Sequence, residues 1–100
     1  MIVGDGEFRY EVEENWPKKI PEYWTLGQCA DIDVDADDNI WVFSRNLHPV
    51  TKWSKDGEFL GSWGNLGSEK GEFRVPHGLN IDPDGYIWLT DNQTHQVTKH

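Results

Sequence analysis

The chain has 100 residues and a formal net charge of −9, so it forms one domain at most and has little core to spare. The acidic balance argues against nucleic acids and anionic membrane surfaces as partners, because both repel a negatively charged protein. The single cysteine, Cys29, excludes an internal disulfide, and no apolar run is long enough to span a bilayer.

The N-terminal segment predicts a single strand followed by an irregular connection. Residues 5–12 read DGEFRYEV, and the same tetrapeptide DGEF opens a later strand at residue 56. We therefore expect residues 5–13 to form the outer strand of a sheet that lies elsewhere. The next stretch, NWPKKIPEYW, carries two prolines and should be irregular. Its apolar residues are expected to cover the edge of a sheet: Trp16, Ile20, Tyr23 and Trp24.

The rest of the chain is an internal repeat. The run ADIDVDADDNIWVFSRNLHPV, from Ala30, matches HGLNIDPDGYIWLTDNQTHQV, from His77, at a constant offset of 47 residues without gaps. Both copies contain short β-branched and aromatic runs between turn residues, and neither has a helical period. A repeat of this kind predicts β-propeller blades. We expect one blade at 25–64, with strands at 30–35, 39–44, 50–54 and 59–63, and three strands of a second at 75–100, namely 79–82, 86–90 and 96–99.

The fold class predicted is therefore all-β, with two four-stranded antiparallel blades for each chain. Two blades cannot bend into a ring, and each leaves a broad apolar face in water. We expect the N-terminal strand to complete the second blade of a neighbouring copy, so that identical chains close into a ring. The alternative is that the chain is a fragment of a longer propeller.

Several segments resemble the NHL-repeat family of β-propellers, and within it bacterial proteins similar to peptidyl-α-hydroxyglycine α-amidating lyase. They are HPVTKWSKDGEFLGSWG, PHGL, IDPDG, IWLTD and HQV, and the resemblance extends over residues 10–99. The lyase-like part rests on PHGL and on the arginine of WVFSRN. Propellers of that family have six blades, so the resemblance implies a homotrimer with two blades from each chain.

The resemblance also implies two site residues. Family lyases hold a catalytic zinc in the central cavity through three histidines, and the histidine that matches is His77. A trimer would gather three copies of it around the axis and leave a fourth zinc position open. Arg45 matches an arginine that holds the substrate carboxylate through its planar fork. The alternatives are a structural His77, hydrogen-bonded to the next blade, and a rim Arg45 that pairs with a nearby acid.

Other polar residues have plainer interpretations. His48 and His95 occupy one repeat position in both copies, which favours a structural hydrogen bond across the hairpin. The aspartates of the two turns resemble a calcium loop only superficially and lack EF-hand spacing, so calcium is a less favoured cofactor than zinc. They are Asp35, Asp37, Asp82 and Asp84. Cys29 is expected to be a small buried residue near the first inner strand.

Function stays open between two classes at this point. The first is a metal-dependent lyase that converts a peptidyl-α-hydroxyglycine to a peptide amide and glyoxylate. The lyase family uses a tyrosine as proton acceptor, and no tyrosine stands near Arg45, so the general base is unassigned. The second is a non-catalytic module that binds a small molecule or a peptide on the polar face made by Arg45, Asn46, Asn92 and Gln93. The absence of a signal peptide after Met1 predicts a cytoplasmic product.

Overall fold

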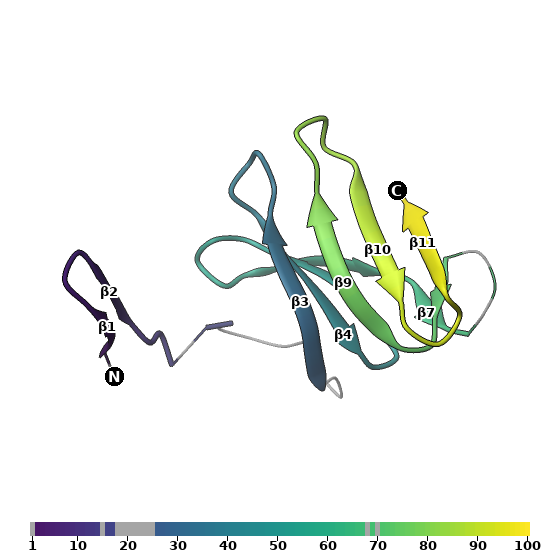
Figure 1. Ribbon diagram of the computed structural model, residues 1–100, viewed down its shortest axis with the longest axis horizontal. Helices are drawn as coiled ribbons and strands as arrows, with labels where there is room; N and C mark the ends of the chain where they lie inside the picture. Colours follow the sequence, from purple (N-terminus) through teal and green to yellow (C-terminus); the bar gives the residue numbers. More distant parts are fainter. Residues whose placement is uncertain (1, 15, 18–25, 68, 70) are drawn as a thin grey trace.

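The computed structural model describes residues 2–14, 16–17, 26–67, 69 and 71–100, and these form strands, turns and loops without a helix (Figure 1). No helix in this part of the chain could therefore cross a membrane. The all-β prediction is confirmed. The strands are β1 (Ile2–Asp5), β2 (Phe8–Glu11), β3 (Gln28–Val34), β4 (Ile40–Arg45), β5 (Val50–Trp53), β6 (Phe59–Trp63), β7 (Asn65–Leu66), β8 (Glu72–Phe73), β9 (Pro76–Ile81), β10 (Ile87–Asp91) and β11 (Gln96–Lys99).

Two antiparallel sheets make up the body of the molecule. The first sheet has the order β3-β4-β5-β6, and the second sheet has the order β9-β10-β11. All seven strands fall where the repeat predicts them, although β3 begins at Gln28 and β9 at Pro76, earlier than expected. The extra residues were not recognised because they lie beyond the alternating part of each run.

The repeat is reproduced at the level of hydrogen bonds in the turns. The Asp35 carboxylate accepts the backbone N–H of Asp37 and Asn39 and, at 2.8 Å, the indole N–H of Trp41. The Asp82 carboxylate accepts the N–H of the residues at the same offsets and, at 2.9 Å, the indole N–H of Trp88. Both aspartates therefore shape the turn that joins the first two strands of each sheet.

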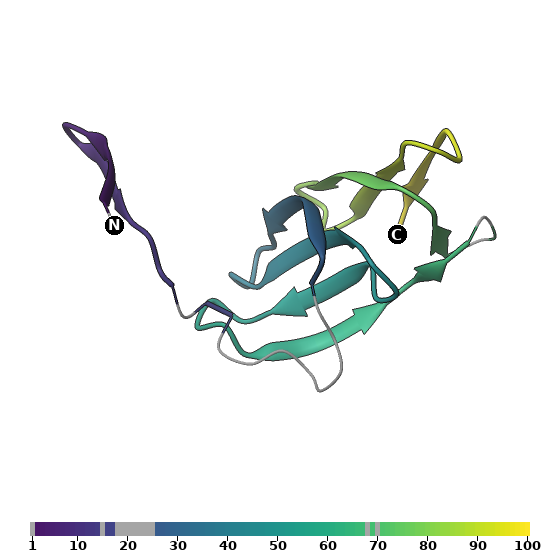
Figure 2. The ribbon, with the colours of Figure 1, turned by 90° about the horizontal axis from the view of Figure 1, so that it is seen from below.

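The N-terminal segment differs from the prediction. A strand at Phe8–Glu11 is present, but it pairs with a further strand, Ile2–Asp5, in a hairpin that stands apart from the two sheets (Figures 1 and 2). Sequence reasoning missed β1 because Gly4, with φ of 85°, interrupts an already short strand pattern. The side chains of the hairpin are exposed, including Phe8 and Tyr10.

The two sheets pack face to face. Residues directly opposite each other in an antiparallel ladder share a face. The core face of the first sheet carries Trp41, Phe43, Val50 and Trp63, and the core face of the second sheet carries Leu79, Ile81, Ile87 and Leu89. Phe73, from the connection between the sheets, fills the same core and meets the Phe43 ring edge-on at 5.0 Å.

In the described part of the chain, the opposite faces of the sheets are not packed against a further sheet. The face of the first sheet is exposed along β3 but buried on β4 and β5, where Val42 and Trp53 are 4% and 0% exposed. The open face of the first sheet carries Ile32, Val34, Ile40 and Val42, and the open face of the second sheet carries Asn80, Trp88, Thr90, Val97 and Lys99. Part of the first open face is covered by Trp16, whose ring lies 6.1 Å from that of Trp53 and whose indole N–H donates to the Lys55 carbonyl. The expected covering role of Trp16 is thus seen, whereas Ile20, Tyr23 and Trp24 lie outside the described residues.

Two carboxylates join the first strands of the two sheets, β3 and β9. Asp31 accepts the Leu79 N–H through Oδ2 at 2.8 Å, and Asp33 accepts the Ile81 N–H through Oδ2 at 2.7 Å. The Oδ1 atoms accept the N–H of the next residue on their own strand, Ile32 and Val34, both at 2.8 Å. Each aspartate therefore satisfies one amide on β3 and one on β9. The expectation that Cys29, beside them, is buried was wrong, because this thiol-bearing residue is exposed.

Replacing either aspartate should loosen the contact between the sheets. We expect Asp31→Ala and Asp33→Ala each to lower the free energy of unfolding by about 1–3 kcal/mol, because each leaves two backbone donors without an acceptor. Urea denaturation followed by tryptophan fluorescence measures this loss. Asp37→Ala is the matched control, since Asp37 is exposed and lies in a turn. An equal loss in the control would contradict a special role for the two inner carboxylates.

Candidate functional site

Every predicted site residue lies at one end of the pair of sheets. The first strands of the two sheets, β3 and β9, start at this end, and their partners β4 and β10 finish there, at the lower side of Figure 1. The residues concerned occupy these strand ends and the loops that follow them: Arg45, Asn46, His77, Asn92 and Gln93. The direction of the strands thus brings the candidate side chains to a common end.

His77 is the extra residue of a β-bulge. The ladder between β9 and β10 passes from Gly78 opposite Thr90 to Pro76 opposite Asp91, which leaves His77 without a cross-strand partner. Bulges re-aim a side chain and are common beside functional sites. The Gly78 N–H donates to the Thr90 hydroxyl at 2.8 Å, which closes the bulge from the other side. The His77 ring is exposed and makes no hydrogen bond within the described residues.

The same bulge occurs in the first sheet without an imidazole. There the ladder passes from Cys29 opposite Ser44 to Asp31 opposite Phe43, so Ala30 is the extra residue. Ala30 corresponds to His77 in the 47-residue repeat. The geometry is therefore a property of the repeat, and only its second copy uses the position for a side chain that can bind a metal.

Arg45 reaches from the first sheet to the residue before His77. Its Nε donates to the Pro76 carbonyl at 2.9 Å. One of its five N–H donors is used in this bond, and no carboxylate pairs with Arg45 in the described part of the chain. The bond fixes the guanidinium next to the start of β9, so the structure brings Arg45 and His77 together.

Asp91 anchors the loop of the second sheet to the segment that leads into β9. Only 7% of its surface is exposed, and its carboxylate accepts N–H groups from both sides: Arg74 and Val75 before β9, and Gln93 and Thr94 in the loop. Burial acts to raise the pKa of Asp91, but these backbone donors outweigh it and hold the pKa below its ordinary value. The Asn92 N–H adds a bond to the Val75 carbonyl at 2.9 Å.

The corresponding loop of the first sheet is held by Asn46. Its side-chain oxygen accepts the His48 N–H at 2.7 Å, and its amide group donates to the Leu26 carbonyl at 2.7 Å. His95 has a positive φ of 58°, which fits the turn after β10. The hydrogen bond that the sequence assigns to the rings of His48 and His95 stays a prediction.

The described part of the chain does not by itself assemble a metal site. In the described residues no three histidine, cysteine, aspartate or glutamate side chains lie close enough together to hold an ion. No tyrosine of the described residues lies beside His77 to act as a proton acceptor. Tyr86 follows the turn at the opposite end of the sheets, Tyr10 belongs to β2, and Tyr23 is outside the described residues. His77 is thus a single exposed donor beside a cationic side chain.

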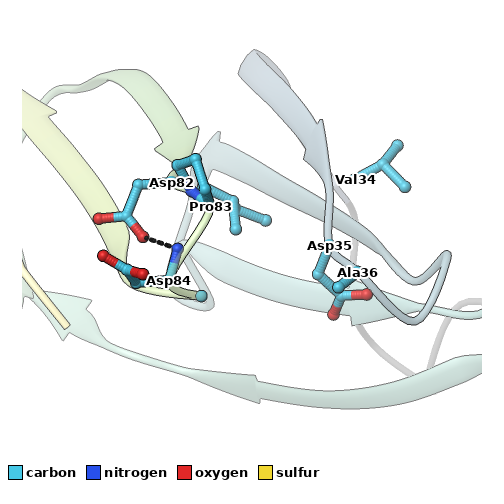
Figure 3. A pocket seen from close by; sticks show the side chains of 8 residues that line it. Val34, Asp35, Ala36, Asp82, Pro83 and Asp84 are labelled. Carbon is cyan, nitrogen blue, oxygen red and sulfur yellow. Dashed lines mark hydrogen bonds between the residues drawn. The ribbon is translucent and has the colours of Figure 1, made fainter.

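The acidic turns lie at the other end of the sheets. They border a groove of about 420 Å³ that is lined by Asp35, Asp82 and Asp84 together with apolar residues (Figure 3). In Asp35 and in Asp82, Oδ1 accepts a backbone N–H of the same turn, and Oδ2 accepts the indole N–H of a tryptophan on the following strand. These carboxylates therefore act as turn acceptors, in agreement with the preferred interpretation of the sequence over a calcium loop.

Removing the Asp91 carboxylate should release the β10–β11 loop. Because the folded pKa is depressed, this carboxylate stabilises the fold above its unfolded pKa of about 3.9, and the contribution is lost as pH falls through the lower folded value. We expect Asp91→Asn to lower the free energy of unfolding at pH 7 by about 1–3 kcal/mol and to flatten the stability profile below the unfolded pKa of about 3.9.

The profile is measured by urea titration at a series of pH values. Asp38→Asn is the control, since Asp38 is an exposed turn residue. An Asp91→Asn profile that runs parallel to the wild type down to acid pH would contradict this role of the carboxylate.

No family model matches the chain, but individual proteins do. It is 32% identical over 114 aligned residues to the peptidylglycine alpha-amidating monooxygenase of Rattus norvegicus, a match that covers 94% of this chain and 11% of the relative. It is 44% identical over 53 residues to peptidyl-alpha-hydroxyglycine alpha-amidating lyase 1 of Drosophila melanogaster, which covers 53% of this chain and 8% of the relative. Lyase 2 of that organism is 28% identical over 111 residues, covering 86% of this chain and 25% of the relative.

The chain thus spans between a tenth and a quarter of the relatives it matches over most of its length. Proteins named as monooxygenases and proteins named as lyases share this segment. Over most of its length, the chain is therefore homologous to a segment common to the amidating monooxygenases and the peptidyl-α-hydroxyglycine α-amidating lyases.

Proposed function

We propose that the chain is a two-blade unit of a metal-dependent lyase, which converts peptidyl-α-hydroxyglycines to peptide amides and glyoxylate. The observation that carries this proposal is the bond from Arg45 Nε to the Pro76 carbonyl, which places a guanidinium beside the bulged His77. Both residues stand in the segment that is homologous to the amidating lyases.

Arg45 is suited to hold the carboxylate of the substrate. A guanidinium presents a planar fork that can bind both oxygens of a carboxylate, and the bond to Pro76 keeps the fork from rotating away. The substrate of this reaction ends in a carboxylate next to the carbon that bears the hydroxyl. Binding that carboxylate at Arg45 would orient the reacting carbon toward the start of β9.

His77 is suited to be one ligand of zinc. The imidazole is exposed, and the bulge directs it away from the ladder. When bound there, zinc would supply a Lewis acid for an oxygen of the substrate. A single histidine cannot hold the ion, because catalytic zinc sites commonly use three protein ligands.

We propose that the further imidazoles come from other copies of this chain. We propose that the two sheets are blades of a six-bladed ring built from three copies, so that three His77 side chains face a common axis. The 47-residue repeat and the family resemblance support this arrangement. The N–H groups of β9 are held by Asp31 and Asp33 of the neighbouring sheet, which would fix the height of each His77 along the axis.

The second candidate is a non-catalytic module that binds a carboxylate-bearing ligand at Arg45, Asn92 and Gln93. It is favoured by the absence of a tyrosine at this end of the described chain, since proton transfer then has no assigned residue. Both candidates use Arg45 in the same way and differ only in turnover.

Turnover separates these candidates, and metal content tests the proposed zinc ligand. We expect about one zinc for every three chains of the wild type, and its loss in His77→Ala, because each copy contributes one ligand. Arg45→Ala should keep its zinc and raise KM for a peptidyl-α-hydroxyglycine about 10–100-fold, since it loses a charge-assisted bond to the substrate. Elemental analysis measures the metal, and glyoxylate release measures turnover.

His48→Ala is the matched control, because this histidine belongs to the loop beside Arg45 and should leave zinc content unchanged. Zinc that persists in His77→Ala would remove the proposed metal ligand. Bound zinc without glyoxylate release in the wild type would favour the binding module.

A further inference from the structure

The two open faces of the molecule are repeat copies of the two faces that it buries. Val50 on the first core face is 0% exposed, whereas Val97, its equivalent on the open face of the second sheet, is 66% exposed. Leu79 on the second core face is 6% exposed, whereas Ile32, its equivalent on the open face of the first sheet, is 56% exposed. On the first open face the exposure is confined to β3, since Val42 on the same face is 4% exposed. The β3 part of that face and the open face of the second sheet are therefore two halves of a contact that the described residues do not make.

We propose that the open face of the first sheet in one copy docks onto the open face of the second sheet in another copy. The contact repeats the one between the core faces within the chain. Ile32 and Val34 of one copy take the places of Leu79 and Ile81, and Trp88 and Val97 of the other take the places of Trp41 and Val50. The partner is thus a second copy of this chain, bound head to tail.

The position of Trp16 supports this partner. Trp16 lies on Trp53 with ring centroids 6.1 Å apart and 52° between the planes. A shift of 47 residues along the repeat converts Trp16 and Trp53 into Trp63 and His100. These two rings are also in contact, with centroids 4.7 Å apart and 48° between the planes. Trp63 is the last residue of β6, the outer strand of the sheet that packs against the sheet of His100. Trp16 therefore lies where the outer strand of a preceding sheet would end.

The position of Trp16 requires a further sheet in front of the first sheet. The second sheet of another copy is suited to be that sheet. Its outermost strand, β11, has an open edge: the Ile87 and His100 backbones exchange both hydrogen bonds, so the alternating ladder turns the N–H and C=O of Val97 and Lys99 away from β10. Their equivalents in the first sheet, Val50 and Lys52, pair with β6. A groove of about 250 Å³ runs along this edge, lined in part by Gln96, Thr98 and His100.

The hairpin supplies a strand for that edge. β2 and β6 both begin at the phenylalanine of a DGEF tetrapeptide, and a tryptophan follows each of them: Trp63 ends β6, and Trp16 comes after β2 with four more residues between phenylalanine and tryptophan. One edge of β2 pairs with β1 and the other is open. When the two open faces meet, Trp16 of one copy brings β2 to the β11 edge of the other, and strand addition satisfies the backbone groups of both.

The new contact should be weaker than the internal one. Within the chain, Asp31 and Asp33 provide carboxylates to the amides of β9. At the equivalent positions on β9, Gly78 has no side chain and Asn80 offers a neutral amide. Copies should therefore separate at protein concentrations or temperatures at which each chain is still folded. This prediction does not depend on the lyase proposal, because a binding module would have the same faces.

Light scattering coupled to size exclusion tests the contact. We expect the wild type to run as a multiple of 11.6 kDa, about 35 kDa for a ring of three, and to dissociate on dilution. Ile32→Asp and Val97→Asp should each prevent the ring from closing and lower the mass, because each buries a charge in one of the two faces. Both residues are exposed in the single chain, so far-UV circular dichroism should be unchanged.

Mixing the two variants distinguishes a head-to-tail contact from a symmetric one. The Ile32→Asp chain keeps an intact second-sheet face, and the Val97→Asp chain keeps an intact first-sheet face. An equimolar mixture should form a species of two chains, while each variant alone should be monomeric. Leu47→Asp is the control, since Leu47 is exposed in the loop between β4 and β5, outside the strands of both open faces, and should leave the wild-type mass unchanged.

A disulfide fixes the alignment of the copies. In a Cys29→Ala background, Val34→Cys together with Asn80→Cys should give covalently linked multiples under oxidation, because their internal equivalents, Ile81 and Asp33, are hydrogen-bonded neighbours. The pair Leu60→Cys and Asn80→Cys should remain single chains. A wild type that stays monomeric at high concentration overturns the proposal, as does a mixture of the two aspartate variants that shows no association.

Discussion

The architecture depends on the two carboxylates that link β3 to β9. The inner strand of each sheet has a free edge, and a row of unpaired N–H groups there would be costly wherever water is excluded. Asp31 and Asp33 together accept hydrogen bonds from four of these donors. Each carboxylate uses one oxygen for an N–H of β3, its own strand, and the other oxygen for an N–H of β9. The spacing of the sheets is thereby set by hydrogen bonds of fixed length as well as by the apolar core.

The candidate site is a consequence of this spacing. Once β9 is fixed against β3, its first residues lie beside the end of β4, and Arg45 can reach the Pro76 carbonyl. The two copies of the repeat are not equivalent at this end. Ala30 replaces His77 at the bulge, and Ser44, whose buried hydroxyl has no partner in the described residues, replaces Asp91. The imidazole and the guanidinium come from different sheets, so the candidate site requires both sheets.

Sequence reasoning reached the strands and the end of the sheets at which the site lies. The turns around Asp35 and Asp82 mark the strand boundaries locally, and alternating strand direction then assigns Arg45 and His77 to one end. The bulge at His77 was out of reach, since a register shift depends on which residues of two strands face each other. The alternation in ADIDVD indicated only a half-buried strand. The role of Asp31 and Asp33 depends on amides 48 residues away along the chain.

One signal in the sequence could have indicated that role. Asp31 and Asp33 correspond to Gly78 and Asn80, so the carboxylates are absent from the second inner strand although the surrounding residues are retained. Carboxylates on every inner strand would line the centre of a ring with like charges, in a chain that already carries −9. In the proposed ring, an acidic inner strand alternating with a neutral one would halve that charge and still give the pair of sheets within each chain its hydrogen bonds. The contact within a chain would then be stronger than the proposed contact between copies, so each chain would fold as a pair of sheets before any further sheet is added.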